Sequence, residues 1–571
     1  MNIKKIAIKN VKSFGKEVTI GFNEDLNIFI GPNAGGKSNL MDILNIALAY
    51  FFIHSWRIRT EFDETGGVRK KYFEERHTIF DPINRLLEKH LKKQEENQQI
   101  NVVFVPEKED IENIKNVIDS QEKLIVFEKN EYGSALLKNE FLSQFGQFDI
   151  NSLIKKELEF IIDNNNPIQI SSIASENKIF FNYLRFFNFL NLLIESYNRD
   201  AKEDVKKIPD LYPPIAYFSP YRVSQARSLT VTISSTDYFD LLERYAKSDS
   251  RSISSTFEVA NYYFAKKLRY LNDDITKFKS EEEINFIKEY IKKLGYKDFG
   301  YECKNKEKNI YEGFLLKSDG TQLDLSRASG GEKEILNFLL GVFALNVKNG
   351  VFIIDEPELH LHPRWQQVLL ELFSDFTKNR GIQFFIVTHS PHFVTPRSIK
   401  SIFRVYSKNG ESQVVAPQIL NENDKELFML VNIFNNTKMF FADKVILVEG
   451  DIDQIIYGSI LEKTQIKKKD SVVIEIINVQ QTGGAKKNKE FLKKWQIKSY
   501  GIFDKDKESE LQGLQKVHIL KNGKIEDYFQ NVVKKKKYKI GDAIKIAKHI
   551  KESNVEIPSE LKGIFKKILK D

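Results

Sequence analysis

Short apolar runs and longer amphipathic stretches alternate along this chain of 571 residues, which predicts a mixed α/β protein. Residues 3–30 contain two or three strand-like segments, with turns at Gly15 and at residues 21–25. The last segment, LNIFI at residues 26–30, is mostly apolar, and an apolar-rich helical pattern follows at residues 39–52. The chain is therefore expected to open with a buried strand, a glycine-rich loop and a helix.

The next part of the chain is charged. Residues 55–99 predict helices and surface loops, because their charge pattern is typical of a solvated face. The runs INVVFVP, residues 100–106, and KLIVFEKN, residues 123–130, predict strands of an antiparallel sheet beside the first glycine-rich loop. Residues 135–210 predict helices, and we interpret the aromatic stripe at residues 180–194 as core or dimer packing.

Three patterns lead to the second half of the chain. IAYFSPYR, residues 215–222, predicts a strand whose following turn carries Arg222 and Gln225, two candidates for reaching a nucleotide. The charged segment at about residues 228–296 predicts a helical arm or dimerisation insertion. A hairpin with a turn at Asp319-Gly320 should follow.

The loop after residue 30 is GPNAGGKS, which fits G-x-x-x-x-G-K-[ST] without a substitution. In such a loop backbone N–H groups point at phosphate oxygens, Lys37 neutralises the β- and γ-phosphates, and Ser38 places a hydroxyl on Mg2+. The sequence therefore predicts binding of ATP with Mg2+. The residues expected to contact the nucleotide here are Gly31, Asn33, Gly35, Gly36, Lys37, Ser38 and Asn39.

Two later strands end in groups that suit ATP hydrolysis. VFII, residues 351–354, is followed by Asp355 and Glu356. The aspartate is expected to hold Mg2+ together with Ser38, and the glutamate to polarise the attacking water. A second buried strand, within residues 383–390, ends at His389, which is expected to touch the γ-phosphate.

A further motif, SGGE, opens an apolar helix at Ser329. A serine and two glycines at a helix start can bind an anion, although such a run also serves as an ordinary N-cap. The four motifs as a set resemble the ABC-type ATPase heads of SMC-like repair proteins and of OLD (overcoming lysogenization defect) ATPases, over about residues 1–420. The resemblance implies a dimer of heads, with Ser329, Gly330 and Gly331 completing the nucleotide site of the other head. Glu332 stands where transporters often carry glutamine.

Composition limits the other possibilities. The single cysteine, Cys303, excludes an intramolecular disulfide and fits a reducing cytoplasm, and the N-terminal segment lacks the apolar block of a signal peptide. Apolar stretches are too short or too interrupted to span a membrane, so we expect a soluble, cytoplasmic protein without a membrane partner. The histidines are interpreted as strand-end and helix-start residues, not as zinc ligands, because no carboxylate or cysteine partners occur at site spacing. They are His360, His362, His389 and His392.

After residue 435 the pattern starts again. One apolar strand, residues 445–448, ends at Glu449, and a later one ends at Asp504 and Asp506. Strands and helices alternate, which predicts a small parallel α/β domain with acids at the carboxyl ends of its strands. Three such acids suit Mg2+ or Mn2+, but a solvated acidic loop neutralised by nearby lysines fits the spacing equally well.

The segments EGDID and DKD resemble a TOPRIM domain, the metal-dependent fold of topoisomerases, primases and OLD-family nucleases, over about residues 440–535. The resemblance assigns the metal site to five acids, which are Glu449, Asp453, Asp504, Asp506 and Glu526. Glu449 is expected to act as a base or as a metal ligand. The lysine of such sites has two candidates, Lys521 and Lys524.

Lysines cluster around these acids, and we favour DNA contact over simple solvation as their role, since phosphates bind lysines. The clustered lysines are Lys467 to Lys469, Lys486, Lys487, Lys489, Lys493, Lys494 and Lys534 to Lys537.

The combined hypothesis is an ABC-type ATPase head at residues 1–435 and a TOPRIM nuclease domain with a basic C-terminal tail at residues 436–571. The resemblance implies an ATP-dependent, metal-dependent DNA endonuclease of bacterial defence against phage. It would act as a homodimer or higher even-numbered oligomer, with room for a separately encoded defence partner. An alternative is an SMC-like ATP-driven DNA sensor or clamp that recruits an effector without cutting. Strand passage ranks last, because no module for it is evident, although Tyr500 and Tyr528 lie near the acids.

Overall fold

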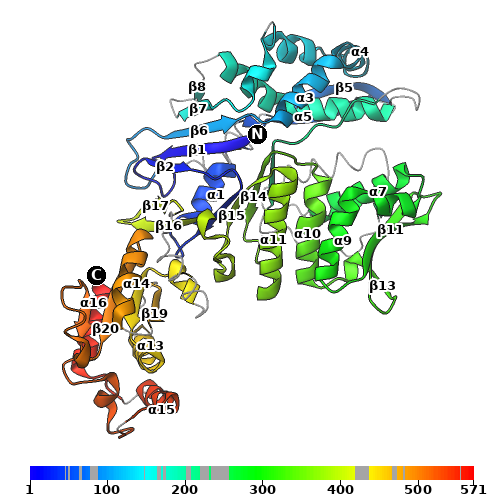
Figure 1. Ribbon diagram of the computed structural model, residues 1–571. Coiled ribbons are helices and arrows are strands. Elements are labelled where there is room, and N and C mark those ends of the chain that lie inside the picture. Colours follow the sequence, from blue (N-terminus) through cyan, green and yellow to red (C-terminus); the bar gives the residue numbers. More distant parts are fainter. Residues whose placement is uncertain are drawn as a thin grey trace. The chain divides into compact units, whose positions relative to one another are not determined.

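The computed structural model describes residues 1–45, 47–48, 52–63, 67–76, 88–146, 148–163, 169–171, 175–200, 207–218, 231–232, 256–417, 428, 436–465, 472–479, 482–535, 537–552 and 555–571. Figure 1 colours them from the N-terminus (blue) to the C-terminus (red). The chain divides into two compact units. The first holds residues 1–29, 36–388 and 407–413, and the second holds residues 30–35, 389–406 and 414–571.

The first unit contains an antiparallel sheet in the order β2-β1-β6-β7-β8 (Figure 1). The strands predicted within residues 3–30 and for INVVFVP are confirmed. Two more strands, β7 and β8, lie where helices were predicted. Side chains of β7 alternate between buried and exposed positions, a period of two that fits a strand better than a helix. The bounds are β1 (Asn2–Lys9), β2 (Val18–Gly21), β6 (Gln99–Val105), β7 (Leu158–Asp163) and β8 (Gln169–Ser171).

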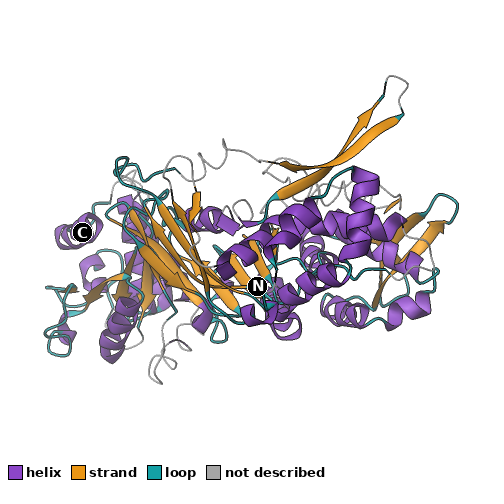
Figure 2. Cartoon of the chain, turned by 90° about the horizontal axis from the view of Figure 1, so that it is seen from above, coloured by secondary structure: helices purple, strands orange, loops and turns teal. Residues whose placement is uncertain are grey.

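A second, parallel sheet runs in the order β3-β15-β14-β9. Strands β3 and β15 are buried along their whole length, which explains why their sequences lack polar alternation. Helices α10 and α11 run side by side (Figure 1). Figure 2 colours all strands of the chain orange and all helices purple. The elements are β3 (Leu26–Ile30), α1 (Lys37–Asn45), β9 (Ile215–Phe218), α10 (Gly330–Ala344), β14 (Val351–Asp355), α11 (Pro363–Arg380) and β15 (Gln383–Val387).

The prediction of a strand for KLIVFEKN is wrong. The segment lies in helix α4 (Gln121–Tyr132), which follows α3 (Lys108–Asp119) and ends at Gly133, a left-handed C-cap with φ of 60°. The buried side chains of α4 are Leu124, Glu128 and Tyr132, spaced four residues apart on one helical face. Burial of one helical face therefore favours a helix over the strand that the run of apolar residues suggests.

The prediction of helices within residues 55–76 is also wrong. These residues form a hairpin of β4 (Ser55–Phe62) and β5 (Val68–Arg76). Opposite charges face each other across it: Glu61 pairs with Lys70, and Arg57 with Glu74, in register. Cross-strand pairs of this kind stabilise a two-stranded ribbon, so the charge pattern belongs to the hairpin.

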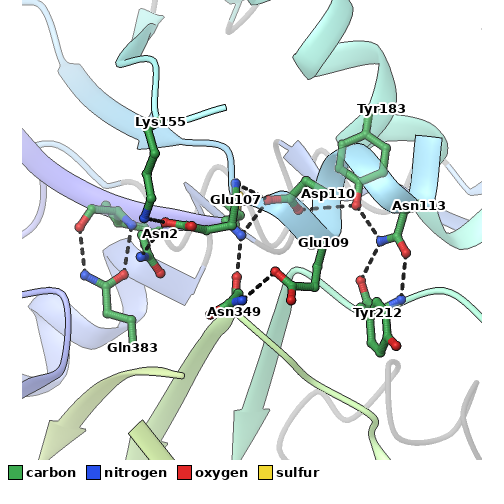
Figure 3. A network of polar contacts seen from close by, with 12 residues as sticks. Asn2, Glu107, Glu109, Asp110, Asn113, Lys155, Tyr183, Tyr212, Asn349 and Gln383 are labelled. Atoms are coloured by element: carbon green, nitrogen blue, oxygen red, sulfur yellow. Dashed lines mark hydrogen bonds and ion pairs between the residues drawn. The ribbon is translucent and has the colours of Figure 1, made fainter. Parts of the chain in front are cut away.

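The aromatic stripe, predicted as core or dimer packing, lies in helix α5 (Ser175–Asp200), where several of its rings are buried in the core. Phe180, Phe186 and Phe189 are fully buried. A buried polar network joins α5 to the start of α3: Asn113 Nδ2 donates to the Tyr183 hydroxyl at 2.9 Å, and that hydroxyl donates to Asp110 Oδ1 at 3.3 Å (Figure 3).

The same network joins the two sheets of the first unit. The side chain of Gln383, at the start of β15, donates to the carbonyl of Ile3 and accepts from its amide, both at 2.8 Å. Asn2 Nδ2 donates to Glu107 Oε1 at 2.9 Å (Figure 3). Because these groups are buried, each depends on its partner, and the parallel sheet is held against the antiparallel one.

The described part of residues 228–296 consists of the short strand β10 (Val231–Thr232) and three helices joined by short turns. Whether it is an arm or a dimerisation element stays a prediction. The hairpin at Asp319-Gly320 is confirmed: the Gly320 amide donates to the Lys317 carbonyl at 3.0 Å. The bounds are α7 (Thr256–Tyr270), α8 (Ile275–Ser280), α9 (Glu282–Lys293), β11 (Asp298–Asn305), β12 (Ile310–Leu316) and β13 (Gln322–Asp324).

The second unit contains the predicted small parallel sheet, with strand order β19-β18-β20-β21. Its apolar core includes residues from the sheet and from the helices that follow it in sequence. Among the helices that the structure describes, none has both the length and the apolar character that a membrane crossing requires. The bounds are β18 (Lys444–Val448), α13 (Asp451–Gln465), β19 (Ile474–Asn478), α14 (Thr482–Lys494), β20 (Lys498–Phe503), β21 (Val517–Ile519), α15 (Ile540–Lys551) and α16 (Ser559–Lys570). Strands β16 (Ile402–Lys408) and β17 (Glu411–Val415) each contain residues of both units.

Arg404 on β16 is a buried arginine, 1% exposed, within the second unit. Its guanidinium donates to the backbone carbonyls of Phe440 at 3.1 Å, Ala442 at 2.9 Å, Trp495 at 3.2 Å and Gln496 at 3.3 Å. Burial lowers the pKa of Arg404 to about 10, still far above neutrality. One charged side chain thus holds the residues before β18 and the residues after α14 to strand β16.

Candidate functional site

The register of the parallel sheet brings the predicted ATPase residues to one edge. Val387 pairs with Asp355 on one side and with Phe29 on the other, so the carboxyl ends of β14, β15 and β3 lie level. Neighbouring strands are about 4.8 Å apart, which sets Asp355 and Phe29 about 10 Å from each other across β15. This is the edge at which open α/β sheets bind ligands.

The loop after β3 has the backbone of a phosphate loop. Gly31, Ala34 and Gly36 have φ values of 141°, 59° and 105°. A Cβ at Gly31 would lie 2.0 Å from the Val405 carbonyl oxygen, so only glycine fits there. Lys37 is buried at 3% exposure, whereas Asn33 and Ser38 are exposed on the loop. Asn39 donates to the Ser13 hydroxyl at 2.7 Å.

Glu356 stands at the end of β14 with an unusual backbone. Its φ is 47°, in the left-handed region that glutamate seldom occupies, and its amide donates to the Val387 carbonyl at 2.9 Å. Strained residues of this kind occur at functional sites, and the catalytic role of Glu356 stays a prediction. His389, directly after β15, is exposed at the strand end.

The SGGE motif forms an ordered helix start. Ser329 is the N-cap of α10: Glu332 N donates to Ser329 Oγ at 3.4 Å, and Ser329 N donates to Glu332 Oε2 at 2.7 Å. Gly330 is exposed, whereas Gly331 is packed so closely that a Cβ would lie 2.8 Å from the Trp365 ring. Binding to a second head stays a prediction. Arg222 and Gln225 lie outside the described residues.

In the second unit the register also brings acids together. Leu447 on β18 pairs in parallel with Gly501 on β20, so Glu449 and Asp504 follow the ends of neighbouring strands. Asp453 lies in the first turn of α13, and its Oδ2 accepts from the Gly450 amide at 3.0 Å. The Ile525 amide donates to Asp504 Oδ1 at 3.3 Å, which places the segment of Glu526 beside Asp504.

Four carboxylates, Glu449, Asp453, Asp504 and Glu526, form what we call the acid cluster. Asp453 and Asp504 are 9% and 8% exposed. Burial, with repulsion from the other acids, raises the pKa of Asp453 to about 7 and that of Asp504 to about 8. Burial also raises the pKa of Glu526, and Glu449 adds to this effect. Each acid of the cluster therefore acts electrostatically on the other three.

The donor set of the acid cluster fits a hard divalent cation, which prefers carboxylate oxygens. Among the described residues, no three His, Cys, Asp or Glu side chains converge closely enough to hold a metal ion as they stand. Repulsion between the carboxylates explains why they suit a cation chemically but do not converge without one. Buried like charges of this kind favour either protons or a metal.

Asp506 is not part of this cluster. It is exposed, and the main charges that raise the pKa values of Asp453, Asp504 and Glu526 are those of other acids. Next to it, Lys507 Nζ lies 3.3 Å from Glu449 Oε1, and Glu449 raises the pKa of that lysine. Lys507 was not among the residues predicted for the site. Its position directly after DKD was the only available signal.

The candidate lysines differ in their surroundings. The charge of Lys524 lowers the pKa values of Asp504 and Glu526. For Lys521 the contact is made by the backbone: its amide donates to Glu560 Oε1 at 3.0 Å. Lys486 and Lys487 are exposed on α14, whose start follows the carboxyl end of β19. Lys489 is different: its Nζ donates to the Ser499 carbonyl at 3.0 Å, and burial lowers its pKa to about 8. Residues 467–469 and 536 lie outside the described part of the chain.

The raised carboxyl pKa values predict a pH dependence of stability without metal. Unfolded aspartates titrate near pH 3.9, so between about pH 4 and 8 the folded state binds more protons than the unfolded state. Stability from Asp453 and Asp504 is therefore fully present below about pH 4 and is lost as the pH rises through 7 and 8. Urea unfolding in EDTA at pH 5 to 9 should show a steeper decline for the wild type than for Asp504→Asn. Equal slopes would contradict the assignment.

These sites define the class of protein: an ATPase joined to a parallel-sheet domain with the acids of a TOPRIM fold. A family model described as AAA ATPase domain matches residues 1–394, and one described as overcoming lysogenization defect protein-like, TOPRIM domain, matches residues 440–506. The chain belongs to the AAA ATPase domain family and has the ATPase–TOPRIM architecture of the OLD family. The predicted family and fold class are thereby confirmed, and Glu526 lies beyond the matched TOPRIM residues.

Individual relatives are similar over short stretches. The OLD nuclease of Thermus scotoductus is 28% identical over 20% of this chain and 24% of its own length. The retron Vc95 probable ATPase of Vibrio cholerae is 25% identical over 27% of this chain and 29% of its own length. The chain thus spans less than a third of either relative. The SMC head domain from Thermotoga maritima aligns with 73% of this chain and 100% of its own, at 14% identity and a TM-score of 0.33.

Proposed function

We propose that this protein is an ATP-hydrolysing, metal-dependent DNA endonuclease of bacterial anti-phage defence, in which the ATPase regulates cleavage by the TOPRIM domain. The observation that carries the proposal is the acid cluster, which the same chain combines with a phosphate loop. The names of two relatives, an OLD nuclease and a retron probable ATPase, support the nuclease and ATPase parts, and the defence part rests on the resemblance to the OLD family. The division into an ATPase head that ends at residue 435 and a TOPRIM domain that begins at residue 436 is also part of this proposal.

The acid cluster would hold Mg2+ or Mn2+, with Asp504, Asp453 and Glu526 buried beneath and Glu449 nearer solvent. A bound cation would supply activation of water and stabilisation of the leaving oxygen. Lys507, 3.3 Å from Glu449, is placed to neutralise a phosphate near that carboxylate. Exposed Lys486 and Lys487 would bind the DNA backbone.

The ATPase residues would act as the sequence analysis expects. Lys37 and Ser38 would bind the phosphates and Mg2+, Asp355 would share the ion, and Glu356 would orient water. Ser329, Gly330 and Gly331 would complete the site of a second head, which makes a homodimer the minimal active form. His389 would sense the γ-phosphate.

Strand passage requires a tyrosine nucleophile, and the surroundings of the two tyrosines near the acid cluster do not suit that role. Tyr500 is 1% exposed, so its hydroxyl cannot attack a DNA phosphate from this position. The Tyr528 hydroxyl donates to Glu560 Oε2 at 2.6 Å. Neither is presented as a nucleophile.

Plasmid cleavage tests the proposed function. Supercoiled DNA should be nicked and linearised with Mg2+ or Mn2+ and remain intact in EDTA, and lanes with ATP, ADP or no nucleotide give the sign of the control. Intact ATP hydrolysis without cleavage under any of these conditions would contradict the nuclease and favour an SMC-like sensor that recruits a separately encoded effector.

A further inference from the structure

Tyr457 carries a buried hydroxyl group that the fold leaves without a partner. The residue lies on α13, is 1% exposed, and its hydroxyl makes no hydrogen bond to any residue that the structure describes. Buried hydroxyl groups in folded proteins are nearly always paired. The ring is fixed by the apolar core, including Phe565 at 6.2 Å between ring centroids, so the hydroxyl cannot turn to solvent.

The position of Tyr457 directs this hydroxyl at the acid cluster. Tyr457 follows Asp453 by four residues on α13, so the two side chains share one face of the helix. Long side chains in helices lean toward the N-terminus, which carries the phenol toward the turn of Asp453. Burial raises the pKa of Tyr457 well above its usual value, and the charges of Asp453 and Asp504 raise it further.

We propose that Tyr457 is a positioning residue that donates a hydrogen bond to a carboxylate of the acid cluster when a divalent cation gathers the acids. The inference rests on the proposed function, because it requires metal binding by these acids. Asp453 is the expected acceptor: its Oδ2 already accepts from the Gly450 amide, and its Oδ1 lies on the same carboxylate. A carboxylate held by both donors keeps one orientation toward the cation.

The test is Tyr457→Phe in the full-length protein, with Mn2+ binding measured by calorimetry. Phenylalanine keeps the ring and removes only the hydroxyl. Since loss of a group that orients a metal ligand weakens binding about tenfold or more, Mn2+ affinity should fall by that factor. Without metal, the thermal midpoint should stay the same or rise, because the hydroxyl that is removed has no partner there.

Tyr500→Phe is the matched control. Tyr500 on β20 is an equally buried tyrosine of the same apolar core, and the charges that act on it come from Lys516 and Asp571 instead of the acid cluster. Its loss should leave Mn2+ affinity unchanged.

Three results would overturn the inference. Wild-type affinity in Tyr457→Phe would show that the hydroxyl does not serve the metal. A lowered thermal midpoint in EDTA would show a purely structural hydroxyl. Equal Mn2+ affinity in the wild type and in Asp504→Asn would show that the acid cluster does not bind the metal, which would also contradict the proposed function.

Discussion

Replacement of Asp504 by alanine should reduce metal-dependent cleavage of plasmid DNA at least ~100-fold, since loss even of outer-shell partners of a metal weakens affinity or activity about 10- to 100-fold. Asp504 is 8% exposed at the end of β20 and interacts with all three other acids of the cluster. The measurement is initial nicking rate in Mg2+ and in Mn2+, with ATP hydrolysis recorded in parallel. ATP hydrolysis should be retained.

Two matched variants give this result its meaning. Asp506→Ala removes the second acid of the DKD segment, which the structure leaves exposed and outside the acid cluster, so its effect should be smaller than that of Asp504→Ala. Glu508→Gln removes an exposed acid two residues further on and should cut like the wild type. If Asp506→Ala were the more damaging variant, the assignment of the buried acids as the metal site would be wrong.

Glu356→Gln should slow ATP hydrolysis by about 10²- to 10⁴-fold, the range that a positioned acid or base contributes. The amide keeps the size of the side chain, and the left-handed backbone at φ of 47° is unchanged. ATP binding should persist, so bound nucleotide should accumulate and stabilise a dimer. Nucleotide retention and light scattering measure the two effects.

Lys37→Ala separates binding from hydrolysis. Lys37 is buried in the phosphate loop, and its loss should abolish ATP binding together with the nucleotide-dependent dimer. Normal nucleotide affinity in Lys37→Ala would refute the phosphate-loop assignment. Normal turnover in Glu356→Gln would refute the role of the glutamate while leaving the loop intact.

The positions of the candidate acids at the ends of buried strands were predicted correctly from the sequence. The run before Asp355 and the run before Glu449 are apolar and short, and burial on both faces of a parallel sheet is what such runs require. The register then brings their terminal acids to one sheet edge. Long-range neighbours were harder to predict: the pairing of Lys507 with Glu449 spans 58 residues and depends on how the loop after β20 folds back.

Sequence reasoning failed where local patterns compete with packing. The apolar run in α4 fits a strand by composition, but burial follows the four-residue spacing of Leu124, Glu128 and Tyr132. The charges of residues 55–76 pair across a hairpin, and no local rule distinguishes that arrangement from a solvated helix. The TOPRIM resemblance groups Asp506 with Asp504, and the structure shows that Asp504 is buried and Asp506 exposed; the role of Asp506 stays a prediction.

Arg404 has a practical consequence for work on the TOPRIM domain as an isolated fragment. A fragment that starts at residue 436 contains the carbonyls of Phe440, Ala442 and Trp495 but lacks the guanidinium that binds them. Those carbonyls would then face water or remain unsatisfied. A fragment beginning before Ile402 keeps its own arginine, and is the better starting point for crystallisation and for solution work.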